Sequence, residues 1–312
     1  MPQWEGDATI ENVSVQDISD GLVLLDKHHI FETVKRIAKR ATHLSTDRLC
    51  AMQEKVFREL SSLKIALLVV DFQNDFISGS LRVQDGSAAE DPLRTIPLLN
   101  RMLDDYPFDM VVFTQDWHPE NHISFIGAAG DPDRKFMHNY RVRDLEPFDR
   151  VAFKVPSTVQ ILYPAHCVQG SWGAKIHESI SIPADAEFVK KGTNVLVDSY
   201  SAFRDNSGHK INDLEELLKS NGITAVLGCG LAFDICVRHT VVDANNLGFL
   251  TGVIRDCSQG FSQENIKETC RVLDSENIAI VDVWKARSII ERHKVPVEWI
   301  CRLMDLIDNG SL

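Results

Sequence analysis

Apolar and polar positions follow a regular alternation of short and long segments beyond Leu63. Short β-branched or apolar runs are separated by longer stretches with apolar residues at helical spacing, which is typical of a parallel sheet covered on both faces. We predict strands at 65–70, 110–113, 188–189, 225–227, 250–254 and 278–281, and helices at 93–105, 172–179, 211–220, 234–247 and 263–273. The pattern predicts a doubly wound, mainly parallel α/β domain whose ligand lies at the carboxyl ends of the strands.

The two ends of the chain show a different pattern. Residues 1–61 contain amphipathic helical segments such as 30–38 and no strand-like run, so we predict a helical appendage. The α/β domain is predicted to span 62–290, and residues 291–312 to form a helical tail. Within the domain, the charged stretch 127–150, rich in Gly, Pro and Asp, is predicted to be a long surface insertion.

One short segment of the appendage is similar to the middle of a calcium-binding EF-hand loop. In Asp20-Gly21-Leu22-Val23 the Gly supplies the sharp turn and an apolar residue lies two positions later. The same register places Gln16, Ile18 and Lys27 where the loop requires oxygen ligands. The segment is therefore interpreted as a helix-turn-helix remnant that binds no calcium.

Composition and charge narrow the kinds of partner. The 312 residues are 44% hydrophobic and carry a formal net charge of -12, which argues against nucleic acid and anionic membranes because both favour basic faces. No apolar run approaches the roughly 20 residues of a membrane span, and the start lacks a secretion signal. The seven cysteines lack framework spacing and are interpreted as reduced thiols. We expect a cytosolic or nuclear protein with a small neutral or weakly charged ligand, and homo-oligomerisation is compatible with the sequence.

Polar residues with metal-binding chemistry follow two of the predicted strands. Asp71 follows the first strand, where a helix cap or turn former is the plain alternative. Asp116 and His118, at i and i+2 of an extended segment, project to the same side and can reach one cation, with His122 four residues further on. Carboxylate and imidazole suit zinc, iron or manganese. Two ligands seldom hold a metal, and without a third the cluster is a polar turn with Trp117 packed beneath it.

The residue pattern alone does not decide which residue is the third metal ligand or which lysine enters the site. His166 and Cys167 lie in a Pro-led turn, and either side chain can ligate zinc; the alternative is a loop His beside a buried thiol. Lys190 and Lys191 end another strand, where a solvated edge residue is the alternative. A Lys that enters a cleft would stabilise a nearby carboxylate and a developing thiolate.

Cys236 follows the Gly-x-Gly turn after the strand at 225–227 and falls in the first turn of a predicted helix. Unpaired amides and the helix dipole favour anions there, so the thiol is predicted to be biased toward thiolate, and the same amides can stabilise an oxyanion. His239 is one turn away and permits a Cys–His pair, whereas Cys229 is interpreted as buried packing.

Taken together, five stretches resemble the nicotinamidases, within the isochorismatase-like family of cysteine amidohydrolases. These stretches are VVDFQNDF with GSL following, FTQDWHPENHISF, YPAHCVQGSWGAKI, KKGTNVLVDSYSAF and GCGLAFDICVRHTVVDA, in the family's order between about residues 64 and 283. The paired QDWHP and PAHC motifs are characteristic of the nicotinamidase branch. The appendage and the region after Lys285 lie outside the family core.

The resemblance implies roles for residues that spacing alone leaves open. Asp71, Lys191 and Cys236 would form the catalytic triad, and the amides of Ala232 and Cys236 the oxyanion hole, beside a cis peptide at 231–232. The other implied residues are Asp116, His118 and His166 as ligands of one divalent metal, zinc before iron or manganese, with His122 as second choice, and Phe76, Trp117 and Tyr200 as rings around the substrate.

The activity implied is hydrolysis of nicotinamide to nicotinate and ammonia through a cysteine thioester, in NAD salvage. Three alternatives remain. They are a cysteine amidohydrolase of the same fold acting on a carbamoyl or ureido compound, a non-catalytic binding protein that works through its appendage, and a vinyl ether hydrolase that needs neither Cys236 nor a metal.

Overall fold

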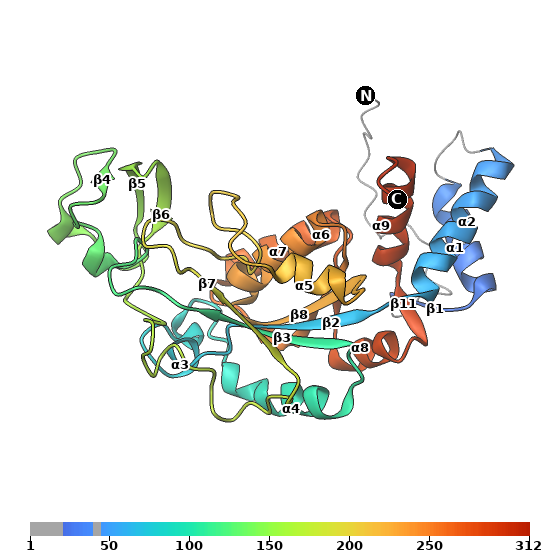
Figure 1. Cartoon of the computed structure of the whole chain (residues 1–312), viewed down its shortest axis with the longest axis horizontal. Helices are drawn as coiled ribbons and strands as arrows, with labels where there is room; N and C mark the ends of the chain where they lie inside the picture. The colour runs from blue at the N-terminus through green and yellow to red at the C-terminus, as the bar shows by residue number, and fades with distance from the viewer. Residues whose placement is uncertain (1–20, 40–44) are drawn as a thin grey trace.

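A six-stranded parallel sheet forms the centre of the molecule (Figure 1). The computed structural model describes residues 21–39 and 45–312. The strand order is β10-β9-β8-β2-β3-β7, and every adjacent pair is parallel. The strands are β2 (Ile65–Val70), β3 (Met110–Asp116), β7 (Glu187–Lys191), β8 (Ala225–Leu231), β9 (Leu250–Gln259) and β10 (Ala279–Val281). All six predicted strands are present, and the doubly wound α/β prediction is confirmed.

Strand β2 shows how the sequence builds both faces of the sheet. All six of its residues are buried, because consecutive side chains point to opposite faces and both faces are covered. Ile65, Leu67 and Val69 join the core that includes α4 and α8, whereas Ala66, Leu68 and Val70 join the core beneath α5, α6 and α7. The helices of these two layers are α4 (Ile96–Asp105), α8 (Val283–Ile290), α5 (Leu214–Ser220), α6 (Arg238–Asn246) and α7 (Gln263–Ser275). Within the described ranges, no helix is long and apolar enough to cross a membrane.

The point where the strand order reverses lies between β2 and β8. From β2 the chain proceeds to β3 and β7 on one side, and from β8 to β9 and β10 on the other. Helices diverge on either side of such a point, so a crevice opens at the carboxyl ends of the two central strands. Asp71 directly follows β2, and the turn with Cys236 directly follows β8.

The predicted surface insertion is larger and more ordered than the sequence pattern indicated. It contains a three-stranded antiparallel sheet, ordered β4-β5-β6, in which β5 pairs with both neighbours. These strands are β4 (Lys135–Phe136), β5 (Arg150–Val155) and β6 (Thr158–Ile161). A small core of its own, which includes Val151 and Phe153, holds this subdomain together, and we predicted none of its strands.

The helix predicted at 172–179 is wrong. The backbone there serves a neighbouring segment instead, since the carbonyls of Gly173 and Lys175 accept the amides of Asp75 and Asn74. Carbonyls used in this way cannot accept the i+4 amides of a helix. Residues 74–77 form the short helix α3 (Asn74–Ile77), which these bonds fix beside the loop.

The helices α1 (Lys27–Ala38) and α2 (Thr46–Ser61) pack with the C-terminal helix α9 (Val297–Asp308) at the opposite end of the molecule from the β4-β5-β6 sheet (Figure 1). The appendage contains α1 and α2, and both helices contact α9. We predicted no strand there, yet β1 (Leu22–Leu24) pairs antiparallel with β11 (Lys294–Pro296). A strand of three residues is too short to show periodicity. Of the EF-hand-like segment, positions 16–20 lie outside the described residues.

Candidate active site

Three strand ends bring a carboxylate, an ammonium and a thiol together. The Nζ of Lys191, the last residue of β7, lies 2.9 Å from the Oδ2 of Asp71 and 3.4 Å from the Sγ of Cys236. The same Nζ lies 2.5 Å from the Oδ1 of Asp116 at the end of β3 and donates to the carbonyl of Ser199 at 3.1 Å. One carboxylate oxygen of Asp71, one of Asp116 and the Cys236 sulfur all lie within 4.8 Å of one another. The convergence expected from the sequence is present.

Burial controls the protonation of this group. It raises the pKa of Asp71 above its usual range, and the Lys191 ammonium offsets only part of that rise. Burial also opposes the ionisation of Lys191 and Asp116, but at these two residues the neighbouring charges have the larger effect. The two carboxylates hold the pKa of Lys191 well above its usual value, and Lys191 with His118 holds the pKa of Asp116 below its own. Lys191 is therefore a permanent cation, and Asp71 is the carboxylate that can exchange a proton.

The environment of Cys236 differs from the sequence expectation. The residue lies in a π-helical turn, Phe233–Val237, and α6 begins two residues later at Arg238. Burial raises the pKa of the thiol well above its usual value, and the nearby Lys191 reduces that rise without cancelling it. The resting group is thus a neutral thiol that needs a base. His239 does not provide one, because its Nδ1 is 2.8 Å from the carbonyl of Ile235 and its ring packs on Tyr200.

The turn between β8 and Cys236 presents backbone to the pocket. The cis peptide expected between Leu231 and Ala232 is present. The carbonyl of Ala232 accepts the amides of Ile235 and Val237 and so closes the turn. Both Ala232 and Cys236 line the pocket, where their amides were predicted to stabilise an oxyanion.

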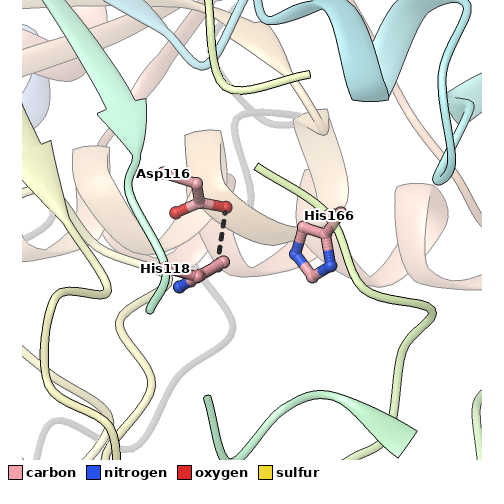
Figure 2. Close-up of side chains that lie close together, drawn as sticks. All are labelled: Asp116, His118 and His166. Carbon is pink, nitrogen blue, oxygen red and sulfur yellow. Dashed lines mark ion pairs between the residues drawn. The ribbon is translucent and has the colours of Figure 1, made fainter. Parts of the chain in front are cut away.

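Asp116, His118 and His166 form a compact, buried set of metal-ligand types (Figure 2). One ligand atom from each lies within 4.8 Å of the others, and the Nε2 of His118 is 3.5 Å from the Oδ2 of Asp116. The Nδ1 atoms of His118 and His166 lie 2.8 Å from the carbonyls of Gly192 and Pro164. A carbonyl can only accept, so each Nδ1 carries a proton and each Nε2 is the nitrogen left to bind a cation. Burial lowers the pKa of His118, but Asp116 outweighs it and raises that pKa, so a metal would displace a proton from the Nε2 of His118.

His122 extends this set. Its ring stacks on that of His118 with centroids 4.1 Å apart, and its Nδ1 is 2.7 Å from the hydroxyl of Ser124. Among the described residues the Nε2 of His122 has no hydrogen-bond partner, and burial with the adjacent His118 lowers the pKa of His122 to about 3. His118, His122 and Asp198 also have ligand atoms within 4.8 Å of one another. A neutral, unpartnered imidazole nitrogen is compatible with ligation.

Side chains of the segment after β2 hold both the loop that carries His166 and the end of β3 at Asp116. The Oδ2 of Asp75 accepts the amide of Cys167, the residue after His166, at 2.7 Å. Gln73 bonds both backbone groups of Asp116: its Nε2 donates to the carbonyl at 2.7 Å and its Oε1 accepts the amide at 2.8 Å. Cys167 itself is buried with its sulfur 3.9 Å from the carbonyl of Gly173. This arrangement favours His166 over Cys167 as the ligand.

The cavity beside these groups is small, about 50 Å³. Phe76 and Tyr200 line it, as predicted for rings around a substrate, and Trp117 does not. The ring of Trp117 lies against the Nζ of Lys190, 3.7 Å from the ring centroid, and its role at the substrate stays a prediction. The residues that line the cavity without having been predicted are Leu81, Val83, Phe148, Tyr163, Asp198, Ile235 and Phe261. Tyr163 directly precedes the PAHC motif, a signal that could have found it, whereas Phe148 and Phe261 stand in no motif.

The sequence matches the model of the isochorismatase domain over residues 65–282. The chain belongs to the isochorismatase-like family. The nicotinamidase of Escherichia coli is 37% identical over 198 residues, which cover 62% of this chain and 83% of that protein.

Two solved structures of the isochorismatase-like family show the same fold. A nicotinamidase/pyrazinamidase of Acinetobacter baumanii has a TM-score of 0.62 and 32% identity, covering 72% of this chain and 98% of that one. A pyrazinamidase of Pyrococcus horikoshii, solved in complex with zinc, has a TM-score of 0.53 and 30% identity, covering 70% of this chain and 99% of that one. The matched residues run from the start of β2 to just before α8, and α1, α2 and α9 lie outside them.

Proposed function

We propose that the chain is a nicotinamidase, which hydrolyses nicotinamide to nicotinate and ammonia through a thioester on Cys236. The observation that carries the proposal is the position of one buried ammonium, Lys191, in contact with Asp71, Asp116 and Cys236 at once. The Escherichia coli relative and the Acinetobacter baumanii structure, both nicotinamidases by name, support the choice of substrate.

The first half-reaction follows from the charges of the site. Asp71, whose pKa is raised by burial, accepts the thiol proton as the Cys236 sulfur attacks the carboxamide carbon. Lys191 is within contact of both groups, so it stabilises the negative charge before and after this transfer. The amides of Ala232 and Cys236 would stabilise the resulting oxyanion. As the oxyanion collapses, the C–N bond breaks and Asp71 gives the proton to the departing ammonia.

The second half-reaction regenerates the thiol. Water enters after ammonia leaves, and Asp71 takes its proton as the oxygen attacks the thioester carbon. The C–S bond breaks, the proton passes to the sulfur, and nicotinate is released. The same two backbone amides would stabilise this second oxyanion, and losing one such donor typically costs on the order of 100- to 1000-fold in rate.

A divalent metal, zinc before iron or manganese, fits the buried ligand set. Asp116, His118 and His166 offer one carboxylate and two imidazole Nε2 atoms, and His122 adds an Nε2 that has no hydrogen-bond partner among the described residues. The Pyrococcus horikoshii structure in complex with zinc supports this choice. When bound, the cation would supply a Lewis acid that can coordinate the pyridine nitrogen. Phe76 and Tyr200 would hold the pyridine ring on the apolar wall of the pocket.

Ammonia release by the wild type, Cys236→Ala and Cys270→Ala tests the function. We expect the wild type to release ammonia from nicotinamide, Cys236→Ala to lose at least about 10,000-fold in kcat/KM, and Cys270→Ala, outside the pocket, to retain activity. An inactive wild type would refute the proposal; activity on a carbamoyl or ureido compound instead would favour the alternative amidohydrolase. Activity in Cys236→Ala would refute the nucleophile.

We further infer that the product enters NAD salvage and that the protein is cytosolic. Both inferences rest on the proposed activity, since nicotinate is a precursor of the pyridine nucleotides. Subcellular fractionation and labelling of NAD from isotopic nicotinamide in cells with and without the chain would test them.

A further inference from the structure

A phenylalanine from the insertion forms one side of the mouth of the active-site pocket. Phe148 lines the pocket although it belongs to the loop between β4 and β5, outside every sequence motif. Its ring contacts that of Phe261 at 5.3 Å between centroids and meets that of Tyr163 edge to face at 5.9 Å. The insertion therefore contributes a wall to the site as well as a surface subdomain.

Phe148 is the more exposed of the two phenylalanines in this contact. Its side chain is 46% exposed, and the backbone φ of +73° is unusual for a residue with a bulky side chain. Residues persist in such a conformation where neighbouring contacts hold them, and they are common where a ligand is clamped. Here the backbone amide donates to the carbonyl of Leu162 at 2.6 Å, which orients the ring toward the pocket.

Phe261 is held firmly on the opposite side. Its amide and that of Ser262 donate to the two carboxylate oxygens of Asp234, two residues before Cys236, at 2.8 and 2.9 Å. The amide of Gly260 donates to Glu90 at 2.6 Å, and Glu90 also pairs with Arg255 at 2.6 Å. Phe261 is thus part of the same rigid unit as the nucleophile, and Phe148 is the part of the mouth free to adjust.

We propose that Phe148 is a specificity-determining residue whose ring, seated against Phe261, limits the size of the aromatic amide that reaches Cys236. The cavity is narrow, about 50 Å³, and Phe148 is the most exposed of the residues that line it, so a wider substrate ring would meet this side chain. A substituent on the substrate ring would occupy the space of the Phe148 side chain. The choice of substrate rests on the proposed nicotinamidase function; the size limit at Cys236 does not.

The first experiment compares nicotinamide with a bulkier amide, quinoline-3-carboxamide, on the wild type, Phe148→Ala and Phe148→Leu. For Phe148→Ala we expect KM for nicotinamide to rise about 5- to 20-fold with a smaller change in kcat, because a contact to the bound ring is lost. The ratio of kcat/KM for the bulky amide over nicotinamide should rise at least tenfold, with Phe148→Leu between the two. Phe188→Ala is the matched control: Phe188 is 50% exposed and lies on β7 outside the pocket, so its ratio should remain that of the wild type.

The second experiment needs no turnover. Alkylation of Cys236 is followed by mass spectrometry with iodoacetamide and with the larger N-phenylmaleimide, and the ratio of the two rates reports the width of the mouth. Phe148→Ala should raise the maleimide-to-iodoacetamide ratio at Cys236 at least tenfold, with no change in Phe188→Ala. Equal ratios in wild type and Phe148→Ala would overturn the proposal, even if the wild type hydrolysed nicotinamide. A raised ratio in a protein without amidase activity would support the size limit and refute the nicotinamidase function.

Discussion

Lys191 is the residue on which the chemistry of the site depends. Its ammonium is buried and contacts two carboxylates. Burial without these carboxylates would favour the neutral form of Lys191. With both present it stays charged, and that charge faces the sulfur of Cys236. The strand pattern alone left Lys190 and Lys191 equivalent, and the family resemblance favoured Lys191. The distinction arises because consecutive residues of a strand point to opposite sides, so that Lys190 contacts Trp117 and Lys191 contacts Asp71.

The protonation state of Cys236 gives a first prediction at this scale. Because burial raises the thiol pKa well above its usual 9.0, the neutral form persists at pH 7 and the thiolate appears only at higher pH. The iodoacetamide rate at Cys236 should therefore still be rising above pH 9. Peptide mapping after timed alkylation between pH 7 and 10.5 measures this rate. A plateau reached below pH 9 would show a stabilised thiolate and contradict the neutral resting thiol.

The metal ligands give a second prediction. Asp116→Ala removes one of three converging ligand atoms, so metal content per chain should fall and KM for nicotinamide should rise. His122→Ala should weaken metal affinity by about 10- to 100-fold if its unpartnered Nε2 contacts or supports the ion. Elemental analysis and competition with a zinc-chelating dye measure both effects. Metal occupancy unchanged in Asp116→Ala would mean that the ligand set is wrong.

At the scale of elements, strand ends and the short loops after them place the catalytic groups. The strands could be predicted because fully buried strands produce continuous apolar runs, as in Ile65–Val70. The β4-β5-β6 sheet could not, because its strands are short, partly exposed and embedded in charged sequence. The segment at 172–179 was misassigned because its apolar spacing fits a helix, while its carbonyls bond to residues nearly 100 positions earlier. Long-range hydrogen bonds of this kind leave no local pattern.

Two glycines allow a matched test of how a loop positions a ligand. Gly192 and Gly170 both have positive φ, +64° and +78°, so an Ala at either position is strained by about 1–2 kcal/mol. At Gly192 the added methyl would also overlap the ring of His118, whereas at Gly170 it meets open space. Gly192→Ala should therefore weaken metal binding about 10- to 100-fold, and Gly170→Ala should not. Metal titrations of the two variants provide the comparison, and equal affinities would contradict a positioning role for the Gly192 turn.

In the molecule as a whole, α1 and α2 form one unit with α9 beside the sheet. Val34 in α1, Val56 in α2 and Trp299 in α9 are fully buried in the same core, and the Nε1 of Trp299 donates to the carbonyl of Thr251 in β9. The appendage is therefore continuous with the main core. Sequence analysis predicted helices at both ends but not their association, because nothing local links segments more than 200 residues apart.

This continuity predicts a stability effect separate from catalysis. Val56→Asp would bury an unpaired charge and should lower the free energy of unfolding by about 3–5 kcal/mol, while KM at a temperature below the transition stays that of the wild type. Arg58→Asp, on the exposed side of the same helix, is the control and should change stability by less than about 1 kcal/mol. Denaturant titration measures both. Equal effects of the two substitutions would mean that α2 does not contribute to the common core.

The register of β1 on β11, with Val23 opposite Val295, has a consequence for how the protein is made. The first described strand can find its partner only once residues 294–296 have left the ribosome. Until α9 is also made, it cannot cover α1 and α2, and their apolar faces stay exposed to solvent or to a chaperone. Synthesis from the amino end thus makes the pairing of β1 with β11 a late event, and a chain that stops before α9 leaves α1 and α2 uncovered.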